Sequence, residues 1–391
     1  MAHSNRFAVD LRRISPHIFL VESNTARQPM GGVARYIRHM VSGLHTKYGD
    51  RLVVCSGLRQ LPHSVRRIYL PLRYPWRYSS RLLYEGTNLL EKALLYSIER
   101  SVKPAVIFNP YYGPLASLTP QVFTVYDLML HLYPENLNPK ARRLQLEHMR
   151  RCFVRAAAIL CISNSTKADL LRLHPDLDPT KLHVVPLGVS ESFFQPPKPS
   201  NSSRPYFLFV GNRGGTKNFY RLLEAYAISG LTRDFDLHVV SPHNDFWDGW
   251  SPAEQSFIRS RNLENSVRLS IKVSDEDLAV EYAGAAAFIC PSTYEGFGLP
   301  VLEAFASGTI VACSRTSSLP EAGGTAAFYF DPLNVESMVG ALTKIVQLTS
   351  AERAERIRQG QLHARSLSWA RCISMTCEIL DSVACAKTAT D

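Results

Sequence analysis

The fold of this chain is decided by one stretch, Pro291-Ser292-Thr293-Tyr294-Glu295-Gly296-Phe297-Gly298-Leu299-Pro300-Val301-Leu302-Glu303-Ala304. An apolar run of strand length, residues 285–290, comes directly before it. Two glycines and Pro300 lie between the carboxylates of Glu295 and Glu303. We therefore predict a strand, a glycine-rich turn and a helix with Pro300 in its first turn. Glu295 would then lie at the carboxyl end of a buried strand, where open α/β sheets bind ligands and where helix amides favour phosphate.

The same stretch resembles the Glu-x7-Glu signature of family-four retaining glycosyltransferases, which have the GT-B fold. The resemblance implies that Glu295 lies beside the donor sugar and that Glu303 contacts the ribose of the nucleotide. It also implies that the residues between them contact the donor sugar and its phosphates. Those residues are Gly296, Phe297, Gly298 and Leu299. The alternative interpretation is a structural corner whose two glutamates face solvent.

Composition indicates a globular protein of more than one domain. The chain has 391 residues, of which 46% are hydrophobic and 20% are charged. The eight cysteines are scattered without a Cys-x-x-Cys pair, which argues against a zinc site or a disulfide framework and favours a reducing compartment. The polar N-terminal residues predict no secretory signal, and no apolar run is long enough for a membrane span.

Positive charge is concentrated in the first half of the chain. Residues 1–200 carry a net charge of +14 and residues 201–391 a net charge of −4. Within residues 59–84, six arginines alternate with tyrosines, leucines and a tryptophan. Such a surface suits an anionic membrane or a polyanionic acceptor. A solvated face with core aromatics is the alternative, and we find no recognised nucleic-acid module.

A second glycine-rich turn lies near the start of the chain. Residues 18–21 read as a strand, and residues 33 to about 44 read as a helix. Gly31 and Gly32 precede this helix, and glycines at such a turn let the backbone approach a ligand closely. Their position resembles the glycine-rich loop of family four, which faces donor phosphate and acceptor. A plain turn is the alternative.

One family position departs from the expected residue. The segment Thr124-Val125-Tyr126-Asp127-Leu128 resembles the Thr-x-His-Asp-Leu segment of family four, with Tyr126 in place of the histidine. We expect Tyr126 and Asp127 to contribute to the catalytic site. A tyrosine can bond to a sugar hydroxyl but is a poor base near neutral pH, because its pKa is about 10. His131, five residues beyond Tyr126, is the alternative substitute.

A third glycine-rich loop follows an apolar strand over residues 206–210. This loop, residues 211–219, carries Arg213 and Lys217 before a helix. Glycines expose backbone amides to a diphosphate, and cations offset the charge that grows on a leaving nucleotide. The loop resembles the family segment in which an arginine and a lysine hold the donor diphosphate. Surface charge is the alternative for both residues.

Two Asp-x-Asp patterns raise the question of a metal. They are Asp234-Phe235-Asp236 and Asp275-Glu276-Asp277. The second follows Ser274, and acidic residues are common at helix starts. The family resembled works without a metal, so we predict none.

Together these observations predict an α/β protein with the GT-B fold. Two Rossmann-like domains would face each other across a cleft, with a C-terminal helix that crosses back to the first domain. We place the acceptor-side domain at residues 1–195 and the domain that binds the nucleotide sugar at residues 196–365. The crossover helix and tail would occupy residues 366–391.

The predicted activity is metal-independent transfer of a hexose, with mannose favoured, from a nucleotide-diphosphate sugar. The acceptor would be a saccharide or lipid-linked saccharide in polysaccharide, lipopolysaccharide or O-antigen-type synthesis. No cofactor is expected beyond the donor, for which a GDP-sugar is favoured over a UDP-sugar. A UDP-sugar epimerase of the same fold, or a non-catalytic nucleotide-sugar-binding scaffold, is the alternative. We expect a cytoplasmic location, with peripheral attachment to the inner face of the plasma membrane left open.

Overall fold

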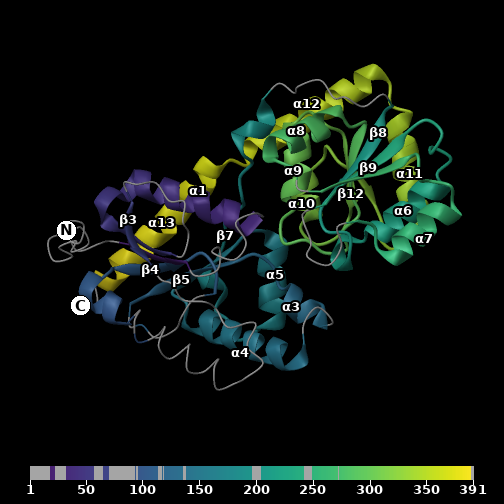
Figure 1. The fold of residues 1–391 in the computed structure, drawn as a ribbon. Coiled ribbons are helices and arrows are strands. Elements are labelled where there is room, and N and C mark those ends of the chain that lie inside the picture. Colours follow the sequence, from purple (N-terminus) through teal and green to yellow (C-terminus); the bar gives the residue numbers. More distant parts are fainter. Residues whose placement is uncertain are drawn as a thin grey trace, which may run out of the picture. The chain divides into compact units, whose positions relative to one another are not determined.

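The computed structural model describes residues 18–22, 32–56, 65–69, 93, 96–112, 117, 119–134, 138–195, 204–241, 249–271 and 273–388. The chain forms two compact units, and each unit is built on a parallel sheet with helices (Figure 1). The first unit comprises residues 1–162, 167–185 and 370–391. The second comprises residues 163–166 and 186–369. The two parallel sheets confirm the predicted α/β class.

The first unit contains a seven-stranded sheet in the order β3-β2-β1-β4-β5-β6-β7. Every pairing is parallel. The order reverses between β1 and β4, so this is where the sheet has its topological switch point. The strands are β1 (Ile18–Glu22), β2 (Leu52–Ser56), β3 (Arg66–Tyr69), β4 (Val106–Asn109), β5 (Gln121–Val125), β6 (Ala158–Cys161) and β7 (Leu182–Val184).

Helices cover the sheet of the first unit because they present apolar stripes to it. Phe123 of β5 and Ile159 of β6 belong to one buried cluster with Met149, Phe153 and Leu170, which come from two of the helices. The helices are α1 (Gly32–Tyr48), α3 (Met129–Leu132), α4 (Pro139–Arg155), α5 (Asn164–Leu173, whose first three residues belong to the second unit) and α13 (Trp369–Thr388, which belongs to this unit from Ala370 onward).

Two sequence interpretations in the first unit need correction. Helix α1 continues to Tyr48 instead of ending near residue 44, because Tyr48 is buried and its hydroxyl donates to Asp381 Oδ1 of α13 at 2.9 Å. The segment over residues 59–84 was not read as containing a strand, yet Arg66–Tyr69 pairs with β2. The remainder of that segment, apart from Val65, lies outside the described residues.

The second unit contains a six-stranded sheet in the order β10-β9-β8-β11-β12-β13. All of its pairings are parallel as well. Here the order reverses between β8 and β11, which are direct neighbours. The strands are β8 (Tyr206–Val210), β9 (Asp236–Ser241), β10 (Val267–Ile271), β11 (Ala287–Cys290), β12 (Val311–Ser314) and β13 (Phe328–Phe330).

Alternate strand residues of the second unit point into one large apolar core. Phe207, Val239 and Ile289 pack there with Leu223 and Leu342 from the covering helices. Figure 1 shows α6, α7 and α11 on one side of this sheet and α8 and α9 on the other. The helices are α6 (Phe219–Ile228), α7 (Pro252–Ser260), α8 (Asp275–Gly284), α9 (Leu299–Ala306), α10 (Leu319–Gly323), α11 (Val335–Val346) and α12 (Ser350–Ser366).

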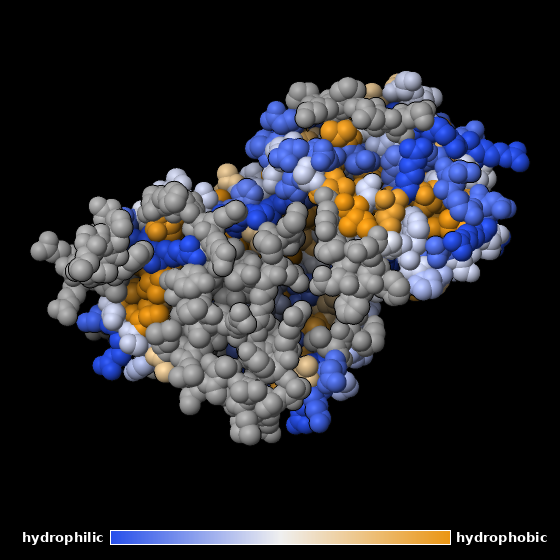
Figure 2. Space-filling view, viewed as in Figure 1, coloured by the Kyte–Doolittle hydropathy of each residue, from blue (hydrophilic) through white to orange (hydrophobic). Residues whose placement is uncertain are grey.

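The visible face of the second unit is mostly hydrophilic, with separate hydrophobic spots (Figure 2). Of its exposed large apolar residues, Tyr220 and Ile228 lie on α6, Leu333 lies in the turn before α11, and Leu362 lies on α12. Scattered exposed apolar residues of this kind are ordinary for a protein surface. Among the described residues, no helix is long and apolar enough to span a bilayer.

Candidate functional site

The switch point of the second unit brings two glycine-rich loops together. One loop follows β8 and the other follows β11, and these two strands are hydrogen-bonded neighbours. Their carboxyl ends lie at the same edge because the strands are parallel. A crevice outside the carboxyl ends of strands at a switch point is where open α/β sheets bind ligands. The loops predicted from the sequence to bind the donor therefore lie at this position.

Asn218 helps to hold the loop after β8 to the loop after β11. Asn218 has a left-handed backbone with φ of 56°. Its side-chain amide donates to the carbonyl oxygen of Pro291 at 2.9 Å and to that of Pro332 at 2.8 Å. Asparagine tolerates this backbone region better than most residues. Asn218 thus ends the short 3-10 helix Gly215–Lys217, starts α6 and fixes the loop that contains Lys217.

Lys217 and Glu295 form an ion pair across the two loops. Lys217 Nζ lies 2.6 Å from Glu295 Oε1, and the two side chains are 25% and 14% exposed. Ser292 Oγ donates to the same oxygen at 2.7 Å. The structure therefore joins the cation predicted to hold the diphosphate to the carboxylate predicted to orient the sugar.

The turn after Glu295 is shaped by Gly298, the N-cap of α9. Gly298 has φ of 103°. A Cβ there would lie 3.0 Å from Ala322 Cβ and 3.1 Å from Leu319 Cδ2, so both the backbone and the space favour glycine. Phe297 is buried, and Leu299 is the first residue of α9. The carbonyl oxygen of Gly296 accepts a hydrogen bond from Ser163 Oγ at 2.8 Å.

Glu303 lies on α9, eight positions after Glu295, and is only 4% exposed. The buried hydroxyl of Tyr282 donates to Glu303 Oε2 at 3.3 Å. A buried carboxylate requires such partners, because desolvation of a charge is costly. Contact between Glu303 and a ribose stays a prediction.

Arg213 has a partner that the sequence did not indicate. Its guanidinium Nε lies 3.1 Å from Glu254 Oε1 of α7, and both side chains are 8% exposed. Arg213 Nη2 donates to the carbonyl oxygen of Gly249, and the guanidinium carbon lies 5.3 Å from the ring centre of Trp250. Glu254 also completes the capping box of α7 with Ser251. These contacts direct Arg213 toward α7, whereas Lys217 turns to Glu295.

In the first unit, Tyr126 and Asp127 follow the end of β5. Tyr126 is 8% exposed, its hydroxyl donates to the carbonyl oxygen of Pro110, and its ring stacks with that of Tyr111 at 5.8 Å. Asp127 Oδ1 accepts from the amide of Met129 at 2.9 Å and so stabilises the start of α3. Their predicted catalytic roles are not tested by these contacts.

His131, the alternative to Tyr126, faces another histidine. His131 Nε2 lies 3.1 Å from His174 Nε2. Burial, with His174 and Arg142 nearby, lowers the pKa of His131 to about 4. The pair is therefore neutral near pH 7, one imidazole donating to the other.

The glycine turn near the N-terminus is described only in part. Gly32 is the first residue of α1 and is exposed. Gly31 and the rest of the loop after β1 lie outside the described residues. The loop leads from β1 to α1 and so begins at the switch point of the first sheet.

Neither Asp-x-Asp pattern forms a metal cluster. Asp236 is fully buried and lies 3.0 Å from Arg204 and 3.2 Å from Arg268. Asp275 and Asp277 belong to the first turn of α8, which Ser274 caps. Across the described part of the chain, no group of three His, Cys, Asp or Glu residues is arranged to hold a metal ion.

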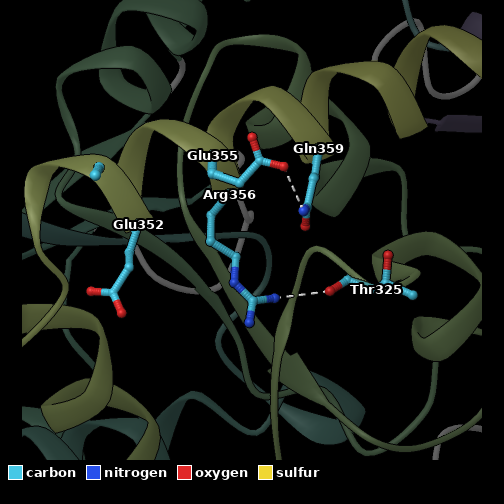
Figure 3. Close-up of a pocket in the computed structure, with 6 residues that line it drawn as sticks. Thr325, Glu352, Glu355, Arg356 and Gln359 are labelled. Carbon is cyan, nitrogen blue, oxygen red and sulfur yellow. Dashed lines mark hydrogen bonds between the residues drawn. The ribbon is translucent and has the colours of Figure 1, made fainter.

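A separate hollow lies between α12 and the turn before β13 (Figure 3), with a volume of about 460 Å³. Arg356 donates to the carbonyl oxygen of Thr325 at 2.9 Å, and Gln359 donates to Glu355 Oε1 at 2.8 Å. Thr325 precedes β13, so the hollow lies toward the amino-terminal edge of the sheet. The loops containing Lys217 and Glu295 lie at the opposite edge.

Comparison with known proteins gives two family matches that together span residues 30–362. Residues 190–362 match the family described as glycosyl transferases group 1. Residues 30–193 match glycosyltransferase family 4.

Individual relatives agree with these matches. The chain is 29% identical over 307 residues to the O-antigen chain mannosyltransferase B of Escherichia coli, covering 75% of this chain and 79% of that protein. It is 31% identical over 204 residues to the MMP α-(1→4)-mannosyltransferase of Mycolicibacterium hassiacum, covering 51% of this chain and 48% of that one. The sucrose-phosphate synthase structure from Thermosynechococcus elongatus superposes with a TM-score of 0.78 at 19% identity, covering 94% of this chain and 99% of that chain. The likeness confirms the predicted GT-B fold.

Proposed function

The chain belongs to glycosyltransferase family 4, the group 1 glycosyl transferases, and on that premise we propose that it transfers a hexose from a nucleoside-diphosphate sugar to a saccharide or lipid-linked saccharide. The observation that carries this proposal is the Lys217–Glu295 pair at the switch point of the second sheet. A cation and a carboxylate at this edge match the two halves of such a donor. The diphosphate needs positive charge, and the sugar hydroxyls need a group that accepts their hydrogen bonds.

The mechanism we propose combines positioning with stabilisation of the leaving group. Lys217 offsets the charge that develops on the departing nucleoside diphosphate, and the amides at the start of α9 add their dipoles. Glu295 orients the sugar, and Glu303 holds the ribose. We also propose that Gly32 and its neighbours allow close approach of the donor, and that Tyr126 and Asp127 take part in catalysis. The ion pair between Arg213 and Glu254 supports the loop after β8, and we propose that Arg213 also contacts the diphosphate. We propose no metal in this reaction and a retained anomeric configuration.

The donor and pathway are narrower proposals. Both curated relatives described above are named as mannosyltransferases, one of them for the O-antigen chain, which favours mannose and a polysaccharide or lipopolysaccharide product. We propose a GDP-sugar before a UDP-sugar as the donor.

The acceptor side of the proposal concerns α4. Its exposed residues include five cations, and the apolar Leu144 and Val154 are 38% and 54% exposed among them. Such a mixture fits an anionic membrane surface or a lipid-linked acceptor. Sedimentation with anionic vesicles tests whether the chain binds a membrane surface. Absence of binding at low salt would contradict the membrane proposal. The cations are Lys140, Arg143, Arg150, Arg151 and Arg155.

The first experiment measures thermal stabilisation by GDP, UDP, ADP, CMP and their common sugars. A ligand that binds only the folded chain raises the melting temperature by mass action. We expect the nucleotides of one base to stabilise the chain most. The nucleotide sugars of that base are then incubated with the chain, with and without acceptor. Transfer to the acceptor supports the proposal. Conversion of the donor alone would identify an epimerase, and stabilisation without either reaction would identify a scaffold.

A further inference from the structure

Ser292 carries a buried hydroxyl, and no role for it was predicted from the sequence. It follows β11 by two residues and is 1% exposed. Its Oγ donates to Glu295 Oε1 at 2.7 Å, and Cys290 Sγ lies 3.7 Å away as a weaker neighbour. Its carbonyl oxygen accepts from Thr316 Oγ1 at 3.3 Å. Ser292 is therefore fixed at the strand end and directed at the carboxylate of Glu295.

The carboxylate of Glu295 is bound asymmetrically. Both of its donors in the described part of the chain, Ser292 Oγ and Lys217 Nζ, approach Oε1. The backbone of Glu295 is held as well: its amide donates to Ser317 Oγ at 2.9 Å, and its carbonyl oxygen accepts from Ser318 Oγ at 2.8 Å. These four contacts fix the backbone and one carboxylate oxygen, which leaves Oε2 to accept a hydrogen bond from a ligand.

The two donors to Oε1 differ in how permanent they are. Lys217 has a flexible stem and a charge that a diphosphate attracts, so its bond to Glu295 weakens as the donor substrate binds. Ser292 is uncharged and buried, and a diphosphate does not draw it away. It therefore keeps the carboxylate in one orientation when Lys217 turns to the phosphates.

We propose that Ser292 is a positioning residue. It holds Glu295 Oε1 so that Oε2 accepts a hydrogen bond from one hydroxyl of the transferred sugar. This inference rests on the proposed function. It predicts that Ser292 affects the sugar and its transfer, and that it has little effect on binding of the nucleoside diphosphate.

The test compares the Ser292→Ala and Ser292→Thr variants with the wild-type chain. We expect kcat for Ser292→Ala to fall about ten- to a hundredfold, the range for loss of a hydrogen bond to a charged group. The Kd for the nucleoside diphosphate alone should stay within about twofold, because its contacts are retained. Ser292→Thr keeps the hydroxyl and should recover most of the lost rate. Ser266→Ala, which removes another buried hydroxyl that bonds to Leu263 at the amino end of β10, serves as the control with unchanged kcat.

A second measurement uses donor sugars that each lack one hydroxyl. In the wild-type chain, transfer should be slowed most when the missing hydroxyl is the one that donates a hydrogen bond to Glu295 Oε2. In Ser292→Ala, this penalty should shrink, whereas a merely structural serine would leave it unchanged.

The outcomes separate the two proposals. Wild-type activity is measured first, because its absence with every donor would overturn the proposed function and this inference together. An active wild-type chain with an equally active Ser292→Ala variant would overturn the inference alone. Equal losses of kcat and nucleotide binding in Ser292→Ala would also overturn it.

Discussion

Lys217 Nζ and Glu295 Oε1 lie 2.6 Å apart, although 78 residues separate them in the chain. Lys217 comes from the loop after β8, and Glu295 comes from the loop after β11. Lys217 and Glu295, both of which we propose to contact the donor, therefore already have each other as partners of opposite charge. Both side chains are largely buried, so the attraction is screened less than that of an exposed pair. Donor binding must exchange or extend this pair, which leads to the first two predictions.

Glu295→Gln should abolish transfer without loss of folding. An amide cannot accept from the sugar as a carboxylate does, and we expect kcat to fall at least about a hundredfold. The nucleoside diphosphate should bind as tightly as to the wild-type chain or more tightly, because Lys217 is released from its counter-ion. Calorimetric titration with GDP and UDP measures the affinity. Glu264→Gln, at an exposed turn, is the matched control. An active Glu295→Gln enzyme would disprove the assigned role.

Lys217→Ala should weaken binding of the nucleoside diphosphate by about 1.5–3 kcal/mol, the range for a hydrogen bond that involves a charged group. The affinity loss should shrink as salt is added, since screening weakens the wild-type contact. Lys344→Ala, an exposed lysine in the last turn of α11, should leave the Kd unchanged. Equal affinities of the Lys217→Ala and wild-type chains would rule out the phosphate contact.

Glu254→Ala should destabilise the fold by about 3–5 kcal/mol, because it leaves the buried guanidinium of Arg213 without its carboxylate. It also removes the capping box of α7. Denaturant unfolding measures this loss. Glu352→Ala removes the capping box of α12, where the glutamate is exposed, and should destabilise far less. Similar losses for the two variants would show that the cap, and not the ion pair with Arg213, explains the effect.

The His131–His174 pair predicts a loss of stability in acid. The folded pKa of His131 is lowered to about 4, mainly by burial, whereas an unfolded histidine titrates near about 6.5. The unfolded state therefore binds more protons between these values, and stability rises with pH across that window. The contribution is complete above the unfolded pKa and is lost as pH falls toward 4.

His131→Phe should reduce the slope of the unfolding free energy against pH, by an amount that corresponds to up to about one bound proton. Unfolding free energies of both chains are measured at several values between pH 4.5 and 7, with the range set by the two pKa values above. Parallel curves for the variant and the wild-type chain would mean that His131 binds protons equally in the folded and unfolded states, which would contradict the lowered pKa.

Local pattern was sufficient for the elements around the site. The apolar run ending at Cys290 formed β11, and Pro300 entered the first turn of α9 as expected. These features depend on spacing and backbone chemistry within a few residues. Helix α1 was predicted too short. Tyr48 at its end packs against α13 and bonds to Asp381, which lies 333 residues further along the chain, and this contact extends the helix. No local signal carries that contact.

The sequence by itself determined which residues we propose for the chemistry, since Lys217, Glu295 and Glu303 are marked by glycine turns and by the Glu-x7-Glu spacing. Only the tertiary structure decided their partners. Pairing of β8 with β11 brought Lys217 to Glu295, and the strand end directed Ser292 to the same carboxylate oxygen. Arg213, four residues before Lys217, paired with Glu254 instead. Strand order and side-chain direction arise from packing between distant segments, and residue spacing along the chain does not encode them.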